Sequence, residues 1–145
     1  MFHEIVIEAA EDADDVTPEA LLASFERLVS GAIAEAGPDQ IVEEAGVESA
    51  AVEAAAAGDV AALRLEDAAA IATVPTDRDA DAVVAELRDH LLMGMATAVL
   101  DVDTIAAAID ADLTGQEVQQ TLEGRAAMTL GQLAAIAAVI EQRKP

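Results

Sequence analysis

The sequence predicts an all-α fold of about eight helices, arranged as two tandem four-helix units. Three observations support this fold class. Apolar residues recur at intervals of three and four along most of the 145 residues, which is the spacing of one helix face. Thr or Asp precedes many of these stretches and Gly or Pro follows them, as expected at helix ends. The second half of the chain also repeats the pattern of the first at a nearly constant offset.

Residues 1–16 are expected to form an acidic N-terminal lead-in outside the helical units. They begin with a short β-like run, Ile5-Val6-Ile7, and pass into the acidic run Glu11-Asp12-Ala13-Asp14-Asp15. Closely spaced carboxylates repel one another and stay hydrated, so we expect this segment to lie in solvent.

Unit one covers residues 17–74. The triplet Thr17-Pro18-Glu19 supplies an N-cap, a proline at the first helical position and an acidic first turn, which together predict a helix start. Gly37-Pro38 ends this helix. Three shorter helices are predicted after it, from Asp39 to Gly46, from Glu48 to Gly58 and from Leu65 to Val74. Residues 76–78 are the best candidate for a linker between the units.

Unit two covers residues 79–143 and begins with a long helix that runs to about Leu100. From Leu91 onward this helix is apolar nearly all round, which predicts the central and most buried helix of the protein. Met93 and Met95 are accordingly expected to fill the core. Three more helices are predicted to begin at the N-caps Asp103, Thr114 and Thr129, and the second of them to end at Gly124.

Unit two repeats the plan of unit one, which indicates an internal duplication. The apolar run 69–74 aligns with 134–139 at an offset of 65 residues, and Gly58 aligns with Gly124 at an offset of 66. Small differences in turn length account for the varying offset. We therefore expect the two units to pack together as a single body.

The segment from Ile41 to Gly58 has the residues of a tight helix-turn-helix. It resembles, without a gap, the helix-turn-helix of the lambda-repressor-like (Cro-type) family. The resemblance implies that Gly46 is left-handed and that Val47 and Val52 lock the two helices together. Unit two matches less well, because an aspartate replaces the glycine and two extra residues precede its second helix.

In the Cro-type family the second helix enters the major groove of DNA and its exposed side chains read base edges. For unit one the resemblance places Glu48, Ser49 and Glu53 there, and carboxylates oppose phosphate binding. For unit two it gives five candidate contacts with nucleic acid or a protein partner, namely Thr114, Gln116, Gln119, Gln120 and Arg125. Gln can pair with adenine and Arg can hold a phosphate, whereas the neighbouring Glu117 and Glu123 work against DNA. The alternative interpretation is a polar helix face that is simply solvated.

The net charge is −22, from 29 acidic and 7 basic residues. The acidic residues are spread along the whole chain, which favours a surface adapted to molar salt, where the Debye length is only about 3 Å. The alternative is an acidic docking face, for example one that mimics nucleic acid. Residues 1–74 hold 17 acidic and 2 basic residues (−15), whereas residues 75–145 hold 12 and 5 (−7). A partner is therefore expected to dock on unit two.

Three segments of the second half are distinctive, and they are Arg88 to Met95, Ala98 to Ile105 and Glu117 to Arg125. Through them the chain resembles an uncharacterised family of short acidic haloarchaeal proteins, over roughly residues 17–145. The resemblance implies a salt-adapted cytoplasmic protein. It implies no activity, because that family has none assigned.

Residue types that carry chemistry are sparse. The chain has no cysteine, and its two histidines, His3 and His90, have no partner at the spacing of metal ligands. We expect His90 to be a hydrogen-bonded packing residue, and Asp101 and Asp103 to serve helix capping rather than a metal. The sequence contains no phosphate-binding glycine loop or nucleophile elbow. We therefore expect no enzyme activity, no cofactor and no metal site.

The predicted function is that of a non-enzymatic binding or interaction protein in a halophilic cytoplasm, with a protein partner or a homodimer. The N-terminus lacks the features of a signal peptide, and the longest apolar run is far shorter than the roughly 20 residues that span a bilayer, so no membrane is expected. The alternative is a DNA-associated transcriptional regulator that uses the helix-turn-helix-like part of unit two.

Overall fold

The structure is a computed structural model that describes residues 1–11, 16–110 and 112–144. Within these residues it is all-helical, which confirms the predicted fold class. The helices are α1 (Phe2–Ala10), α2 (Pro18–Ala36), α3 (Pro38–Ala45), α4 (Ser49–Ala56), α5 (Leu65–Thr73), α6 (Ala80–Ala98), α7 (Val102–Ala108), α8 (Gly115–Leu122) and α9 (Leu130–Arg143). Helices α2 to α5 lie in the range predicted for unit one, and α6 to α9 lie in the range predicted for unit two.

The additional helix is α1, and the prediction of a β-like run at Ile5-Val6-Ile7 is wrong. Phe2 and Val6 are fully buried, and the Phe2 ring lies 5.5 Å from the ring of Phe25, measured between centroids. Two large side chains four residues apart share one helix face, so a helix buries both where a strand would not bury them together with Ala9. Helix α1 packs against α2, α6 and α9. Most of the acidic run that follows lies outside the described residues.

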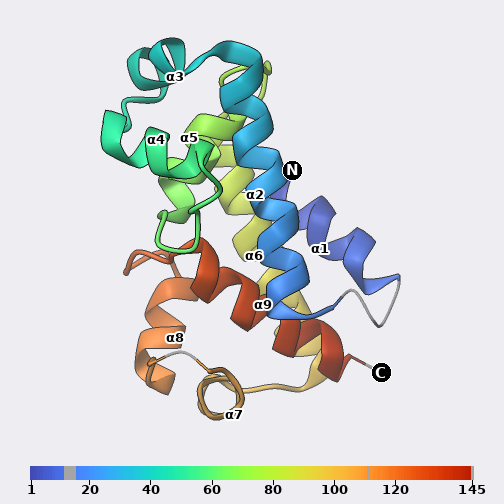
Figure 1. The fold of residues 1–145 in the computed structure, drawn as a ribbon. Helices are drawn as coiled ribbons and strands as arrows, with labels where there is room; N and C mark the ends of the chain where they lie inside the picture. Colours follow the sequence, from blue (N-terminus) through green and yellow to red (C-terminus); the bar gives the residue numbers. More distant parts are fainter. Residues whose placement is uncertain (12–15, 111, 145) are drawn as a thin grey trace.

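Helices α2 and α9 form the centre of the protein, as Figure 1 shows. Each packs against several other helices, and α9 buries eight of its fourteen residues. Helix α6 buries only five of nineteen, so the prediction that it is the most buried helix is wrong. An apolar composition on all sides permits central burial but does not require it, and the alanine-rich α9 occupies that place because small side chains allow several helices to approach it.

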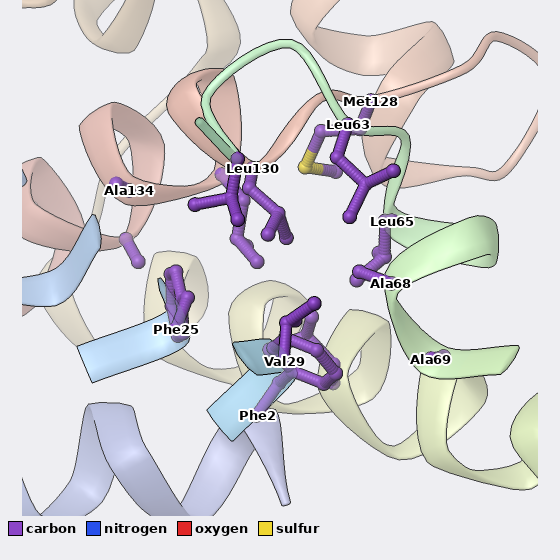
Figure 2. Packing of buried hydrophobic residues seen from close by; sticks show 14 of the residues in the cluster. Phe2, Phe25, Val29, Leu63, Leu65, Ala68, Ala69, Met128, Leu130 and Ala134 are labelled. Carbon is purple, nitrogen blue, oxygen red and sulfur yellow. The ribbon is translucent and has the colours of Figure 1, made fainter. Parts of the chain in front are cut away.

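The core is one continuous cluster of apolar side chains from both halves of the chain. Figure 2 shows Phe25 and Val29 of α2 facing Leu65 of α5 and Leu130 of α9. All four side chains are fully buried. Burial of such a side chain stabilises the fold by about 1.5–3 kcal/mol, so this cluster supplies the main force that joins the two halves.

The segments that lead into α5 and α9 pair with each other in an antiparallel bridge between Arg64 and Thr129. The Leu65 amide donates to the Met128 carbonyl at 2.7 Å, and the Leu130 amide donates to the Leu63 carbonyl at 2.9 Å. These two bonds exchange places when every number is shifted by the 65 residues of the predicted repeat. The bridge therefore relates the two halves by an approximate two-fold axis, which supports the predicted duplication.

Candidate interaction surface

The predicted contact residues of unit two lie on and beside α8. Thr114 is the N-cap of this helix, and its Oγ1 accepts from the Glu117 amide at 3.2 Å. The Glu117 carboxylate in turn accepts from the Thr114 amide at 3.0 Å. This reciprocal pair satisfies two amides that the start of a helix leaves open. Thr114 is therefore engaged in holding the helix start.

Glu123 brings two of the other predicted residues together. Its carboxylate accepts from Gln119 Nε2 at 2.9 Å and from Arg125 Nη2 at 2.7 Å. These hydrogen bonds, that from Gln119 first, lower the pKa of the Glu123 carboxyl group. The guanidinium that was predicted to hold a phosphate is thus already paired with a carboxylate.

The remaining two predicted residues differ in exposure. Gln116 is exposed on the outer face of α8, whereas Gln120 is half-buried and its carbonyl accepts from the Arg125 amide at 2.8 Å. The exposed Glu117 lies in the same helix. The outer face of α8 therefore combines glutamine amides with carboxylates, a surface that can donate and accept hydrogen bonds but attracts no phosphate.

The turn between α3 and α4 has the backbone that its sequence predicts. Gly46 is left-handed, with φ +69°, and ends α3. Val47 and Val52 are buried on either side of the turn. In the equivalent place of unit two, α7 ends at Ile109 in an extended conformation, which agrees with the poorer match there.

The C-terminal end of α6 exposes large apolar side chains that the sequence was expected to bury. Met93 is 70% exposed, Leu92 is 42% exposed and Val99 is 89% exposed. The prediction that Met93 fills the core is wrong, while Met95 is partly buried against the core. The core contacts of this end of α6 pass instead through Leu91 and Gly94 on the opposite face.

Leu92, Met93, Ala96 and Val99 form a continuous surface, which we call the apolar stripe. Leu92, Ala96 and Val99 are spaced by four and three residues and so lie on one helix face, with Met93 beside them. No acidic or basic residue occurs between Asp89 and Asp101. In a chain of which 25% is charged, the stripe is an uncharged window in an acidic surface.

Val99 ends α6 in the left-handed conformation, with φ +55°. Its amide donates to the Ala96 carbonyl at 3.2 Å, and the Leu100 amide donates to the Met95 carbonyl at 2.9 Å. Glycine is the usual residue at this position, because a left-handed residue with a side chain costs about 1–2 kcal/mol. Every other positive φ in the described part of the chain belongs to a glycine. The end of α6 thus carries both an unfavourable backbone conformation and an exposed valine side chain.

The two histidines lie close to each other, with ring centroids 6.4 Å apart. His90 Nε2 lies 3.3 Å from Oε1 of Glu141, which confirms the expected hydrogen bond, and the same oxygen accepts from Lys144 Nζ at 2.7 Å. His3 Nδ1 lies 3.7 Å from Oε2 of Glu86. Among the described residues no group of three or more His, Cys, Asp or Glu side chains is arranged to hold a metal ion.

Asp101 caps α7 where Asp103 was expected to do so. The helix begins at Val102, and the Asp101 carboxylate accepts from the Thr104 amide at 2.7 Å. The predicted cap was wrong by two residues because both aspartates precede the apolar periodicity. The capping role itself explains Asp101 without a metal.

In the described part of the chain, no single helix is long and apolar enough to cross a membrane. Helices α6 and α7 together have a suitable length and composition, but they are bent by 95° at the break between them.

The sequence profile of a family of unknown function, DUF5791, matches residues 21–143. The chain belongs to this family. The prediction of membership in an uncharacterised family is therefore confirmed. The DUF5791 match contains both the apolar stripe and α8. No curated protein and no solved structure matches the chain.

Proposed function

We propose that this DUF5791 protein is a non-enzymatic interaction protein and that the apolar stripe of α6 is its contact surface. The observation that carries the proposal is the exposure of Leu92, Met93 and Val99 at the end of a helix whose other face is anchored in the core. Exposed single apolar residues are ordinary, but a contiguous apolar surface with a polar surround is typical of a protein contact.

The stripe carries a cost that the isolated molecule does not recover. Its three large side chains keep apolar surface in water, and removal of such surface from water stabilises a contact by about 25 cal/mol per Å². The backbone at Val99 adds strain for a side chain that touches little within the chain. Both costs are repaid when another protein covers the stripe.

The acidic surface supports the same type of contact. In molar salt, charged contacts are screened over about 3 Å, whereas apolar burial is kept or strengthened. The even spread of the 29 acidic residues supports a salt-rich cytoplasm as the place of action. A protein in that environment gains more affinity from an uncharged apolar stripe than from ion pairs.

The proposal is tested by photo-crosslinking from two matched positions. Ala96 lies in the stripe, and Ala34 is the exposed alanine near the equivalent end of α2. A benzophenone side chain at position 96 is expected to form protein crosslinks in native cytoplasm at molar KCl, and one at position 34 is not. Equal yields at the two positions, or none at position 96, would contradict the proposal.

DNA binding by α8 is the second candidate function, and the exposure of Gln116 and Gln119 favours it. Because counterion release is weak in molar salt, base contacts would have to supply most of the affinity. Gel-shift assays with genomic fragments in molar KCl test it: specific binding that Gln119→Ala or Arg125→Ala weakens supports a regulator, and absence of any shift rejects it.

A further inference from the structure

We infer that the partner of the apolar stripe is a second copy of this chain, packed against it through an antiparallel pair of α6 helices. The inference rests on the proposed function, because it needs the stripe to be a contact surface. It adds the identity of the partner, the orientation of the two helices and the residues that meet.

Charge selects the partner. The chain carries −22, and Asp89 and Asp101 bound the stripe on either side. A basic partner would find its complement on the acidic faces and not on this uncharged window. A second copy brings an uncharged stripe of the same length, so apolar side chains meet apolar side chains and the acidic faces of both copies stay in solvent.

The positions of the flanking acids select the orientation. A parallel pair would place the two Asp89 carboxylates beside each other, as like charges. An antiparallel pair with its two-fold axis between Leu92 and Met93 places Leu92 against Met93 of the second copy, and Asp89 beside Ala96 of the second copy. Because a two-fold contact is reciprocal, each of these pairs occurs twice.

The side chains suit a close helix pair. Ala96 is small, so the two α6 backbones can approach, and Leu92 and Met93 then fill the centre of the contact. In the antiparallel arrangement Val99 reaches the first half of the second α6, where the exposed Ala85 leaves room. The contact therefore covers Val99, whose exposure and backbone strain the isolated chain leaves unexplained.

The size of the stripe sets the strength of the pair. A typical stable contact buries about 800 Å² on each partner, and a stripe of four residues with its rim is smaller than that. The dimer is therefore reversible and depends on concentration. Salt strengthens it, because molar salt screens the repulsion between two chains of −22 while apolar burial persists.

Sedimentation equilibrium of the purified full chain in molar KCl tests the inference. The average mass is expected to rise from monomer toward dimer over protein concentrations from about 1 µM to 1 mM. Met93→Glu is expected to raise the dimer dissociation constant at least tenfold. Gln116→Glu adds the same charge on exposed α8 and is expected to leave the constant unchanged, with circular dichroism to show that both variants fold.

A mixture of complementary variants tests the register. Met93→Glu and Leu92→Lys each weaken self-association, and mixing them is expected to restore a dimer, because the new glutamate then faces the new lysine of the other copy. Mixing Met93→Glu with Gln119→Lys is the control and is expected to restore nothing. Restoration by both mixtures would contradict the antiparallel contact.

Two outcomes separate this inference from the function on which it rests. If the purified chain stays monomeric at every concentration while position 96 crosslinks to a different protein, the second copy is wrong and the contact surface stands. If position 96 forms no crosslink, both fail. Met93-dependent flotation of a monomeric chain with neutral phosphatidylcholine vesicles would instead assign the stripe to a lipid surface and overturn the inference.

Discussion

The C-terminal ends of α2 and α6 have the same buried pattern and opposite exposed surfaces. The two helices are both nineteen residues long and start 62 residues apart, at Pro18 and Ala80. At this offset four buried pairs coincide, and they are Leu21 with Val83, Phe25 with Leu87, Val29 with Leu91 and Ala32 with Gly94. The inner faces of the two helices therefore perform the same packing role in the two halves.

The outer faces differ where the apolar stripe lies. Leu92, Met93 and Val99 occupy the places that Ser30, Gly31 and Gly37 hold at the end of α2. Both Gly37 and Val99 have positive φ, of +88° and +55°. The fold thus accepts small or polar residues at all three places, and the large apolar residues of α6 are a feature that folding does not require. This difference is our main reason to assign them a contact.

The largest expected effect separates the two faces of α6. Leu91→Ala removes a buried side chain and is expected to lower the free energy of unfolding by about 2–5 kcal/mol, while Leu92→Ala is expected to lower it by less than about 1 kcal/mol. Urea unfolding of dilute protein in molar KCl measures both. Val29→Ala in α2 is the matched core control and should resemble Leu91→Ala. A large loss for Leu92→Ala would mean that the stripe is needed for folding.

The second effect has opposite signs at the two helix ends. Val99→Gly relieves about 1–2 kcal/mol of left-handed strain, part of which is offset by the flexibility of glycine in the unfolded chain, so we expect a net gain of about 0.5–1 kcal/mol. Gly37→Val forces a side chain into φ +88° and ψ 144°, which is expected to destabilise the protein by about 1–3 kcal/mol. Thermal unfolding of dilute protein measures both. A loss of stability for Val99→Gly would show that the exposed valine serves the fold.

The smallest effect concerns α8, whose polar face contrasts with the apolar stripe. Gln119→Ala and Arg125→Ala each remove a donor to Glu123 and are expected to raise the pKa of its carboxyl group toward the ordinary value. Because the folded pKa is depressed, the associated stability is present above the unfolded pKa and is lost as the pH falls through the folded pKa. Carbon-13 NMR of the carboxyl group follows the titration. An unchanged pKa in both variants would show that Glu123 does not hold these two side chains in solution.

The sequence predicts the helices that have strong end signals. Thr17-Pro18, Thr114 and Thr129 are the N-caps of α2, α8 and α9 as expected, because each hydroxyl accepts from an amide three residues later. The left-handed Gly46 follows in the same way from local chemistry. These features depend on neighbours in sequence and need no knowledge of tertiary packing.

Packing between distant segments decides what the sequence does not reveal. The burial of Phe2 depends on Phe25 and on a core assembled from three other helices, and so the β-branched run at residues 5–7 outweighed it. The exposure of Met93 depends on α9, which takes the central place that the composition of α6 suggested for α6. The pairing of Arg125 with Glu123 likewise requires the turn after α8, which the helical period does not describe.

The most direct measurement compares the solvent exposure of two methionine methyl groups by NMR with a paramagnetic co-solute. Met93 is 70% exposed and Met128 is fully buried in the same chain. If the apolar stripe is a contact surface, the Met93 methyl group is strongly relaxed in dilute purified protein and protected in concentrated native cytoplasm, while Met128 is protected in both. A Met93 methyl group that stays equally exposed in both samples, or that is already protected in the dilute protein, would contradict this function.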